Sequence, residues 1–516
     1  MKVSTKHIRM SVLVYMAVFI LVVFVCVHSS GSKPNIVVLF ADDVGYGDLA
    51  CYGHPASYTP NLDGMAKNGM LFTSFYSAAN LCSPSRAALL TGRYHIRSGI
   101  YPFVLGPDST GGLPRNETTI ANILKQQGYH TAMIGKWDLG IGKDMVHFPM
   151  HYGFDKYYGV PYVHGACPCE TCFYPHEGCQ QSVIGGDKCG FDKTYCPLFQ
   201  NMRIIQQPVD LLTLAEKYVD FAKDFITDSA NAGESFFLYL AYNHCHFPQF
   251  AGKRFHNFTQ RGIYGDSLAE IDWSVGEILQ QLRHSQIENN TLVFFTSDNG
   301  AALRDWYNGG SSGMLKCGKA TTYEGGHRVP AIAYWPGQIT AGVSSRDFLT
   351  TLDLLPTITK LSGSVLPKVT IDGMDMSSVL FGQAKSARDN LLYYPAYPDK
   401  KIGAYAIRYK HYKAHFYTEG SPQSGMYNAD TDCHPNNTLH HDPPLLYDLD
   451  RDPGELYNMN KEPQYKDVLE EIKQVKTKLE DAMIWGTSQV NKPKDPRLEP
   501  CCIPGCDPFP SCCRCD

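Results

Sequence analysis

Four short apolar runs, each followed by charged, imidazole or amide side chains, constrain the fold more than any other feature of the sequence. Each run has the length and the β-branched or aromatic content of a buried strand. Segments with helical spacing and helix-ending signals lie between them. The runs lie in residues 34–48, ending in Asp42 and Asp43; 119–140, delivering Lys136 and Asp138; 234–250, ending in His244 and His246; and 291–300, ending in Asp298 and Asn299.

Strands that alternate with helices predict an α/β domain around a large, mixed but mostly parallel sheet. Ligands of such sheets bind beyond the carboxyl ends of the strands, so we expect the four polar termini to converge there. From about residue 385 the sequence changes to tyrosine-rich alternating segments, which predict a second, antiparallel α+β domain. The expected units are a catalytic domain at 32–384, an α+β domain at 385–495 and a cysteine-rich tail at 496–516.

The N-terminus has the pattern of a secretory signal, with Lys2, Lys6 and Arg9 before an apolar run from residue 12 to 27. We predict a signal peptide over residues 1–31; the alternative is a signal anchor, although the run is slightly short for a membrane span. Export to the lysosome or the extracellular space is in keeping with four glycosylation sequons, at Asn116, Asn257, Asn289 and Asn436. The net charge of −5 argues against a nucleic-acid partner.

The chain has 18 cysteines, of which six cluster at 167–196 and six at 501–515. In a secreted chain such clusters indicate disulfides, although their CxxC-like spacings could also suit zinc. Removal of Cys26 with the signal leaves an odd number, so at least one cysteine lies outside the disulfides. The isolated cysteines are Cys51, Cys82 and Cys245.

Asp42, Asp43, Asp298 and Asn299 offer only oxygen ligands, which suit Ca²⁺ or Mg²⁺. Either pair alone would more often be a turn former, but two pairs at strand ends of one sheet favour a metal site. Near them we expect a pocket for a tetrahedral oxyanion, phosphate or sulfate, because a helix start attracts anions and cationic side chains surround it. Its cationic side chains would be Arg86, Lys136, Lys319 and His246.

Cys82 opens the helix that is predicted from the stretch LCSPSRAALLTGR, residues 81–93. It could be a half-cystine, or a thiolate nucleophile whose pKa the helix start lowers. A soft thiolate is, however, poorly matched to hard oxygen ligands. A third interpretation, that Cys82 is a precursor, depends on a resemblance to a known family.

The stretch CSPSRAALLTGR is similar to the signature of the sulfatase family, Cys-x-Pro-Ser-Arg-x₃-Leu-x-Gly-Arg. Further stretches that resemble this family, and its arylsulfatases in particular, run from about Asn35 to the cysteine tail. They include ADDVGYGD, GKWDLG, HCHFPQF, TSDNG, LKCGKATTYEGGHRVPA, KAHFYTEG and LLYDLDRDPGE. The resemblance implies an alkaline-phosphatase-like sulfatase fold. It also implies that the formylglycine-generating machinery oxidises Cys82 to formylglycine during secretion.

The resemblance further assigns roles to single residues. It implies that one Ca²⁺ is held by Asp42, Asp43, residue 82, Asp298 and Asn299. The formylglycine and the sulfate would be oriented by Arg86, Lys136 and Lys319. His246 would act with Lys319 at the leaving oxygen. His415 would line the substrate pocket. It implies a Cys317–Cys433 disulfide and a free Cys51, and it does not assign a partner to Cys245. It also implies that the six cysteines of the tail pair among themselves: Cys501, Cys502, Cys506, Cys512, Cys513 and Cys515. Members of the family tend to form homodimers.

Two positions depart from the family pattern. Asp138 stands where the family has a histidine that contacts the formylglycine hydroxyl, and Val163 stands where its arylsulfatases carry a supporting serine. We predict a working sulfatase acting on aryl, carbohydrate or galactolipid sulfate esters, because the rest of the motif set is intact. The alternative is a catalytically weak glycoprotein that binds sulfated glycans or matrix. A metal-dependent phosphatase is disfavoured, because its nucleophile position usually holds Ser or Thr.

Overall fold

The computed structural model describes residues 33–168, 194–419, 433 and 438–515. The predicted signal peptide, the sequon at Asn436 and the cysteines between 169 and 193 lie outside this range. Asn116, Asn257 and Asn289 are exposed, as acceptors for glycans must be. In the described part of the chain, no helix combines the length and the apolar character that a membrane span requires.

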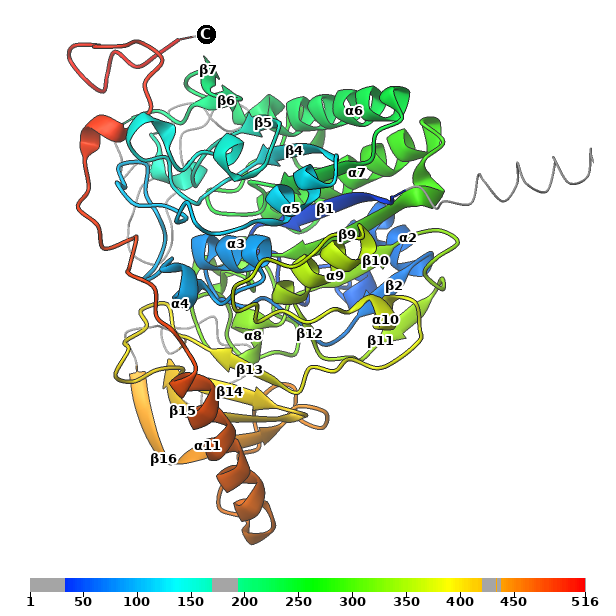
Figure 1. Ribbon diagram of the computed structural model, residues 1–516, viewed down its shortest axis with the longest axis vertical. Coiled ribbons are helices and arrows are strands. Elements are labelled where there is room, and N and C mark those ends of the chain that lie inside the picture. The colour runs from blue at the N-terminus through cyan, green and yellow to red at the C-terminus, as the bar shows by residue number, and fades with distance from the viewer. Residues whose placement is uncertain (1–32, 169–193, 420–432, 434–437, 516) are drawn as a thin grey trace, which may run out of the picture.

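The core of the molecule is a ten-stranded sheet (Figure 1). Five neighbouring strands, β9, β1, β8, β4 and β5, run parallel, and antiparallel pairs occur on both sides of them. This confirms the predicted mixed, mostly parallel sheet. The strand order is β11 (Val343–Ser345), β2 (Met70–Phe72), β10 (Ala331–Tyr334), β9 (Thr291–Ser297), β1 (Asn35–Ala41), β8 (Phe236–Ala241), β4 (His130–Gly135), β5 (Lys156–Gly159), β6 (Leu198–Gln200) and β7 (Arg203–Gln206).

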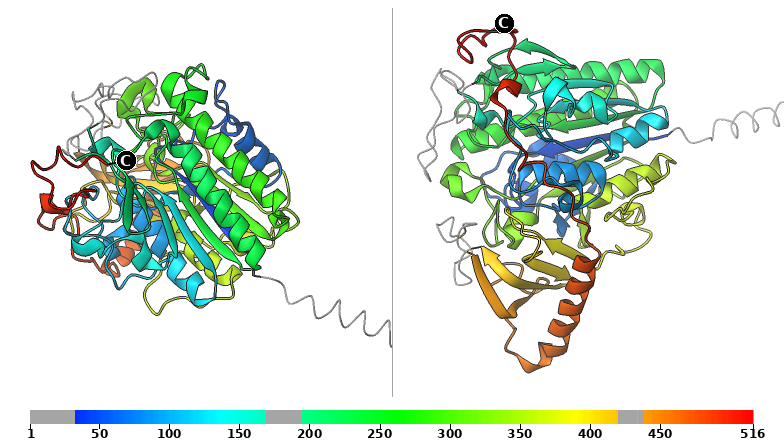
Figure 2. Two further views of the ribbon diagram at one scale, coloured as in Figure 1. Left: turned by 90° about the horizontal axis from the view of Figure 1, so that it is seen from above. Right: turned by 60° about the vertical axis from the view of Figure 1, so that its left-hand side comes forward.

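Helices cover both faces of this sheet, which explains why its central strands are apolar along their whole length (Figures 1 and 2). One layer contains α2 (Pro60–Lys67), α6 (Leu214–Ala232) and α7 (Gly262–His284). The other contains α3 (Cys82–Thr91), α5 (Ile120–Gln126) and α9 (Leu354–Leu361). Every described residue of β1, β8 and β9 is buried. Shorter elements are α4 (His95–Ser98), α8 (Glu324–His327), α10 (Ser377–Leu380) and the pair β3 (Phe75–Tyr76) and β12 (Leu349–Thr350).

A separate four-stranded antiparallel sheet follows, as predicted, with one long helix packed beside it (Figure 1). Its strands are β13 (Asn390–Tyr393), β14 (Ala406–Tyr409), β15 (Tyr412–Glu419) and β16 (Thr438–Asp448), and its helix is α11 (Lys466–Asp481). The chain then returns along the large domain. The tail ends beside the edge strand β7, where Gln207 and Cys515 exchange two backbone hydrogen bonds of 2.7 Å.

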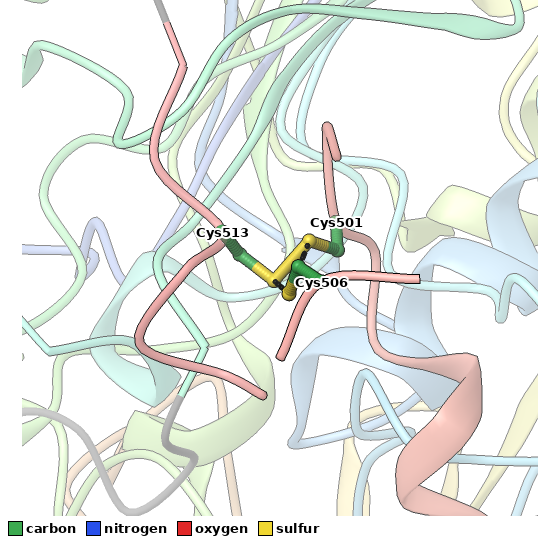
Figure 3. Close-up of side chains that lie close together, drawn as sticks. All are labelled: Cys501, Cys506 and Cys513. Atoms are coloured by element: carbon green, nitrogen blue, oxygen red, sulfur yellow. Dashed lines mark hydrogen bonds between the residues drawn. A yellow bond between two sulfur atoms is a disulfide. The ribbon is translucent and has the colours of Figure 1, made fainter. Parts of the chain in front are cut away.

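The tail is held by disulfides and not by a metal (Figure 3). The sulfur atoms of Cys501, Cys506 and Cys513 gather within 4.8 Å, a spacing that a metal site would also produce. Each of them, however, is oxidised in a disulfide, so none is a free ligand. The described disulfides are Cys501–Cys513, Cys502–Cys515, Cys506–Cys512, Cys317–Cys433 and Cys167–Cys196. Among the described residues Cys51, Cys82 and Cys245 are free.

A buried ionic network joins the second sheet to the large domain. Lys413 of β15 places its Nζ 3.0 Å from Glu324 Oε1 and 3.1 Å from Glu455 Oε1. The backbone N–H of Glu324 donates to Glu455 Oε2 at 2.6 Å, and Tyr76 donates to Glu324 Oε2 at 2.6 Å. His415, expected in the substrate pocket, is fully buried here and lies 2.6 Å from Glu455 Oε1. Its role in substrate binding stays a prediction.

We expect Glu455→Gln to lower the free energy of unfolding at pH 7 by about 3 kcal/mol, since it removes one of the two carboxylates that compensate the buried Lys413 charge. Burial acts to raise the pKa of Glu455, but Lys413 and then His415 lower it to about 2. The carboxylate therefore contributes stability that is present above its unfolded pKa near 4.5 and is lost as the pH falls toward 2. Urea unfolding of both proteins at pH 7 and pH 3 measures this difference.

The matched control is Glu471→Gln, which removes an exposed carboxylate that pairs with Lys410 on the surface of the same domain. Such surface pairs contribute about 0–1 kcal/mol. A Glu455→Gln protein as stable as this control, or a stability difference that does not shrink at acid pH, would contradict the role given to the network.

Candidate active site

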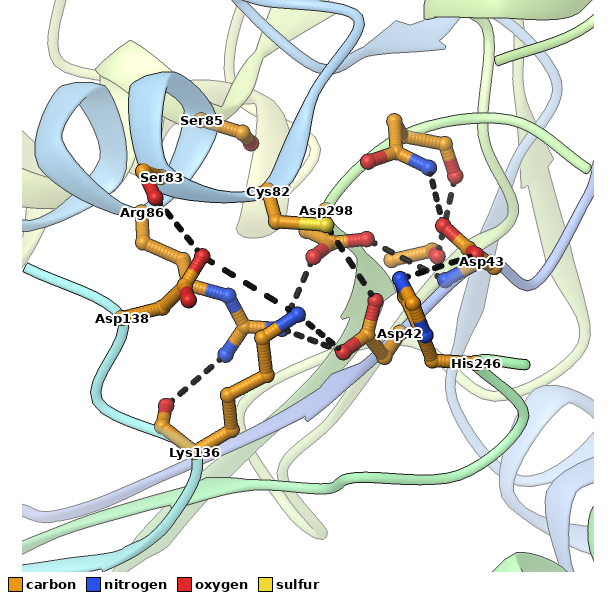
Figure 4. Close-up of polar contacts among 12 residues, drawn as sticks. Asp42, Asp43, Cys82, Ser83, Ser85, Arg86, Lys136, Asp138, His246 and Asp298 are labelled. Atoms are coloured by element: carbon orange, nitrogen blue, oxygen red, sulfur yellow. Dashed lines mark hydrogen bonds and ion pairs between the residues drawn. The ribbon is translucent and has the colours of Figure 1, made fainter. Parts of the chain in front are cut away.

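The carboxyl ends of four neighbouring parallel strands meet at one place, as predicted (Figure 4). Strands β9, β1, β8 and β4 are adjacent and parallel, so the residues after each strand emerge at one edge of the sheet. The residues brought together there are Asp298 and Asn299, Asp42 and Asp43, His246, and Lys136 and Asp138. Helix α3 places Cys82 over the same edge, with Arg86 one turn further along the helix.

The acidic part of the site is a buried cluster of Asp42, Asp43 and Asp298, which present carboxylate oxygens within 4.8 Å of one another. Asn299 donates from Nδ2 to Asp43 Oδ1 at 2.7 Å. Burial, and next the neighbouring Asp42 carboxylate, raise the pKa of Asp298 to about 7. Burial also acts to raise the pKa of Asp42, but nearby Lys136 and other cationic groups hold it well below its usual range. The cluster thus concentrates negative charge in a site from which water is excluded.

Three cationic side chains face these carboxylates. Lys136 Nζ lies 2.7 Å from Asp42 Oδ2, and Lys319 Nζ lies 2.6 Å from Asp43 Oδ1. Arg86 Nη2 lies 2.8 Å from Asp298 Oδ2. Burial acts to lower the pKa values of Lys136 and Lys319, but the carboxylates beside them raise both pKa values above normal. Both lysines are therefore charged at neutral pH, which suits an anionic ligand.

Cys82 is the first residue of α3 and is almost completely buried between the acidic and the cationic groups. Its Sγ lies 3.6 Å from Asp42 Oδ1 and 3.5 Å from Lys319 Nζ. Burial raises the pKa of the thiol well above its ordinary value, more than the two lysines lower it. A free thiolate nucleophile is therefore disfavoured here, although a helix start alone would favour one.

Asp138 contacts Ser83, the residue that follows Cys82 in α3. Ser83 donates from Oγ to Asp138 Oδ2 at 2.8 Å, and its Oγ accepts the backbone N–H of Leu105 at 3.1 Å. Lys136 Nζ is 4.0 Å from the same carboxylate oxygen. Burial raises the pKa of Asp138 despite the opposing effects of Lys136 and Arg86. The side chain is therefore easier to protonate than an ordinary aspartate.

His246 stands at the edge of the acidic cluster, with Nε2 3.8 Å from Asp43 Oδ2. Its Nδ1 lies 2.6 Å from Phe247 O, an acceptor, so Nδ1 carries a proton. Burial, and next the Lys319 charge, lower the pKa of His246 to about 4, so the free imidazole is neutral at pH 7. Neutral Nε2 then has a lone pair that faces the site.

His244 has a different place, which its spacing in the sequence did not reveal. Its Nε2 lies 2.9 Å from Glu270 Oε2 of α7, and the same carboxylate accepts the backbone N–H of Gly252. Glu270 thus holds both ends of the loop that presents His246. A lone glutamate inside an amphipathic helix gives no sequence signal for such a role. Val163 lies at the start of a short turn and is half-buried.

Comparison with known families accounts for almost the whole described chain. Residues 34–364 match the family model described as Sulfatase, and residues 386–515 match the model for the C-terminal region of aryl-sulfatase. Together these two models cover the large domain, the second sheet and the cysteine-rich tail.

Similar curated proteins are arylsulfatases and a related sulfatase. Human arylsulfatase A is 47% identical over 490 residues, covering 93% of this chain and 95% of the relative. Human arylsulfatase G is 37% identical over 505 residues, covering 94% of this chain and 93% of the relative. The canine N-acetylgalactosamine-6-sulfatase is 37% identical over 507 residues, covering 93% and 92%.

Solved structures agree with these matches. The PsFucS1 sulfatase from Pseudoalteromonas sp. superposes with a TM-score of 0.73 at 26% identity, covering 89% of this chain and 93% of that one. Ps i-CgsB in complex with k-i-k-neocarrahexaose superposes with a TM-score of 0.71 at 28% identity, covering 89% of this chain and 94% of that one. A phosphonate monoester hydrolase of Agrobacterium radiobacter, at 19% identity and a TM-score of 0.58, shares the fold. The chain therefore belongs to the sulfatase family and is an arylsulfatase-type sulfuric ester hydrolase.

Proposed function

We propose that this chain hydrolyses sulfate monoesters of aryl, sugar or galactolipid alcohols, with a formylglycine made from Cys82 and one bound Ca²⁺. The observation that carries the proposal is the placement of Cys82 between a buried three-carboxylate cluster and two charged lysines. The test is turnover of an aryl sulfate against the matching aryl phosphate by the purified full chain. Phosphate turnover without sulfate turnover would overturn the proposal.

The acidic cluster fits a calcium ion. Asp42, Asp43 and Asp298 supply carboxylate oxygens, and Asn299 Oδ1 is buried without a hydrogen-bond partner in the described structure. Hard oxygen donors of this kind are the ligands that Ca²⁺ prefers. We assign these four residues, and the modified residue 82, as its ligands. When bound, the ion supplies positive charge that stabilises the oxygens of the transferring group.

Conversion of Cys82 fits its surroundings better than a thiol does. The protonated, buried sulfur lies between a carboxylate and an ammonium group. Ammonium groups and hard cations interact more strongly with an oxygen atom than with a thiol sulfur. The hydrated aldehyde supplies an oxygen nucleophile for attack on sulfur, and its second hydroxyl allows the sulfate to be expelled. The formylglycine-generating machinery of the secretory pathway is thus a required partner.

The remaining residues bind and orient the ester. The Lys136 and Lys319 ammonium groups attract the sulfate oxygens, and Arg86 fixes the Asp42 and Asp298 carboxylates from behind. An anionic sulfate beside His246 favours its protonated form. In that form Nε2 carries the proton that the departing alcohol oxygen needs, while Lys319 stabilises the charge on that oxygen.

We assign Asp138 to proton handling at the nucleophile. Its raised pKa, its contact with Ser83 and its distance of 4.0 Å from Lys136 Nζ support a carboxyl group that exchanges a proton there. A histidine at this position would bring a positive charge instead, whereas a carboxylate repels sulfate. We therefore expect this pocket to release sulfate at a rate set in part by Asp138.

We expect Asp138→Ala to lower kcat for an aryl sulfate by about 10²-fold, the lower range for loss of one general acid or base. Asp138→His restores the side chain typical of the family and should keep or increase turnover. Steady-state kinetics, together with mass analysis showing the aldehyde at residue 82, measure both effects. If the aldehyde is present and Asp138→His shows no turnover, the role given to this position is wrong.

The chain's place in the cell follows from the same proposal. The sequence signal over residues 1–31, the exposed sequons and the disulfides support passage through the secretory pathway, to the lysosome or the extracellular space. We also propose a homodimer, as is usual for the family. Microscopy of the tagged full chain and light scattering of the purified protein test these two points.

A further inference from the structure

Two aromatic side chains, Phe103 and Tyr397, form an exposed, stacked pair. The rings of Phe103 and Tyr397 lie 5.5 Å apart between centroids with an interplanar angle of 10°. Their residues are 43% and 53% exposed. Phe103 has φ of 60°, in the left-handed region that a bulky residue rarely adopts. Its backbone N–H donates to Ala396 O at 2.9 Å, which fixes it beside the loop after β13 that carries Tyr397.

The pair is attached to the segments that build the active site. Val104, next to Phe103, packs in a small apolar cluster with Leu81, Ala320 and Ala396. Leu81 directly precedes Cys82, Ala320 directly follows Lys319, and Ala396 directly precedes Tyr397. The rings are therefore held by the same backbone segments that hold the nucleophile position and a sulfate-binding lysine.

The exposure of the catalytic side chains shows on which side the site opens. Asp42, Arg86 and Lys136 have fully buried side chains. The side chains of Lys319 and His246 remain 16% and 18% exposed. Substrate therefore enters, and the alcohol leaves, on the side of Lys319 and His246. The backbone N–H of Ala320 donates to Asn80 O at 2.9 Å. This hydrogen bond connects the Lys319 segment to the segment before α3, and Ala320 is also part of the apolar cluster that contains Val104.

We propose that Phe103 and Tyr397 form a binding subsite for the ring of the sulfated alcohol, an aryl ring or the apolar face of a sugar. This proposal rests on the proposed function and specifies its substrate class. Aromatic faces bind flat apolar surfaces through dispersion and burial, and an already stacked pair loses little side-chain freedom on binding. The subsite selects ring-bearing sulfate esters over short alkyl sulfates.

The experiment compares the full-length protein with the double variant Phe103→Ala/Tyr397→Ala. For 4-nitrophenyl sulfate and for a hexose sulfate we expect kcat/KM to fall roughly three- to tenfold, mostly through KM, because the rings bind ground state and transition state alike. Turnover of ethyl sulfate, which has no ring, should be unchanged. A loss with only one of the two ring classes identifies which ring the subsite binds. Tyr397→Phe keeps the stack and should retain the ring preference.

A binding measurement separates this proposal from the proposed function. In Cys82→Ala protein, calorimetry gives the ratio of Kd values for inorganic sulfate and 4-nitrophenyl sulfate without turnover. The double variant should reduce the preference for the aryl ester, whereas Tyr457→Ala, an exposed aromatic of the second domain, should not. An unchanged ratio, an equal loss for ethyl sulfate, or a change in oligomeric state alone overturns the subsite. Absence of sulfatase turnover in the protein without substitutions, with the aldehyde present at residue 82, would overturn only the proposed function.

Discussion

Replacement of Cys82 by alanine is expected to lower kcat for an aryl sulfate by at least about 10⁴-fold, the scale seen when a covalent nucleophile is removed. The reason is geometric. Residue 82 lies between the Asp42 carboxylate and the Lys319 ammonium, and alanine leaves no atom there that could attack sulfur. The cationic side chains to which we assign sulfate binding stay in place, so affinity for inorganic sulfate should change far less than kcat.

Mass analysis of the tryptic peptide 68–86 supplies the second part of this test. In the active protein we expect residue 82 to have lost its sulfur, whereas an unconverted chain keeps a cysteine there. Cys51→Ala is the matched control, because Cys51 is also a free cysteine but lies outside the acidic cluster. Full turnover by a chain whose Cys82 is still a thiol would refute the precursor interpretation.

Removal of the proposed Ca²⁺ is expected to lower kcat by about 10³-fold, which corresponds to a loss of about 4 kcal/mol of transition-state stabilisation. Without the ion, Asp42, Asp43 and Asp298 repel one another within a buried site. Added Ca²⁺ should restore activity and raise the free energy of unfolding by about 3 kcal/mol at a hundredfold excess over Kd. Mg²⁺ should restore less, since it requires a smaller and more regular ligand shell.

The variant Asp298→Asn tests the same site from the protein side. It keeps the shape of the side chain but removes one charge, so Ca²⁺ should neither stabilise nor activate this protein to the extent seen without the substitution. Asp228→Asn, which changes an exposed carboxylate paired with Lys156, is the control and should respond normally. Equal calcium responses in all three proteins would show that the cluster is not the binding site. Calorimetric titration and thermal unfolding give the readouts.

The strand ends could be predicted from the sequence because they depend on local patterns. A buried parallel strand must be apolar along its length, so the change to Asp42 or Asp298 marks its end. Parallel neighbours place such ends at one edge, and the structure brings all four together. The motif around Cys82 and the pairing of Cys317 with Cys433 came from family resemblance, and the structure contains that disulfide.

Contacts between distant segments could not be predicted in this way. Glu270 lies on α7, yet it fixes both ends of the loop that carries His246. His415 follows a family motif, yet its side chain lies in the ionic network that joins the second sheet to the large domain. The charge state of Asp138 depends on burial and on Ser83, neither of which its sequence position reveals.

Local patterns in the sequence are sufficient to predict the α/β class, the oxygen-rich strand ends and the sulfatase motif at Cys82, because each depends on residues close together in the chain. Which charges face one another, which groups lose their water, and on which side the site opens depend on the folded structure. The pKa values of Cys82 and His246, and the stacking of Phe103 on Tyr397, follow from burial and from packing between segments far apart in the sequence. Electrostatic and packing energies depend on distance in space, so these properties arise only when the fold brings those segments together.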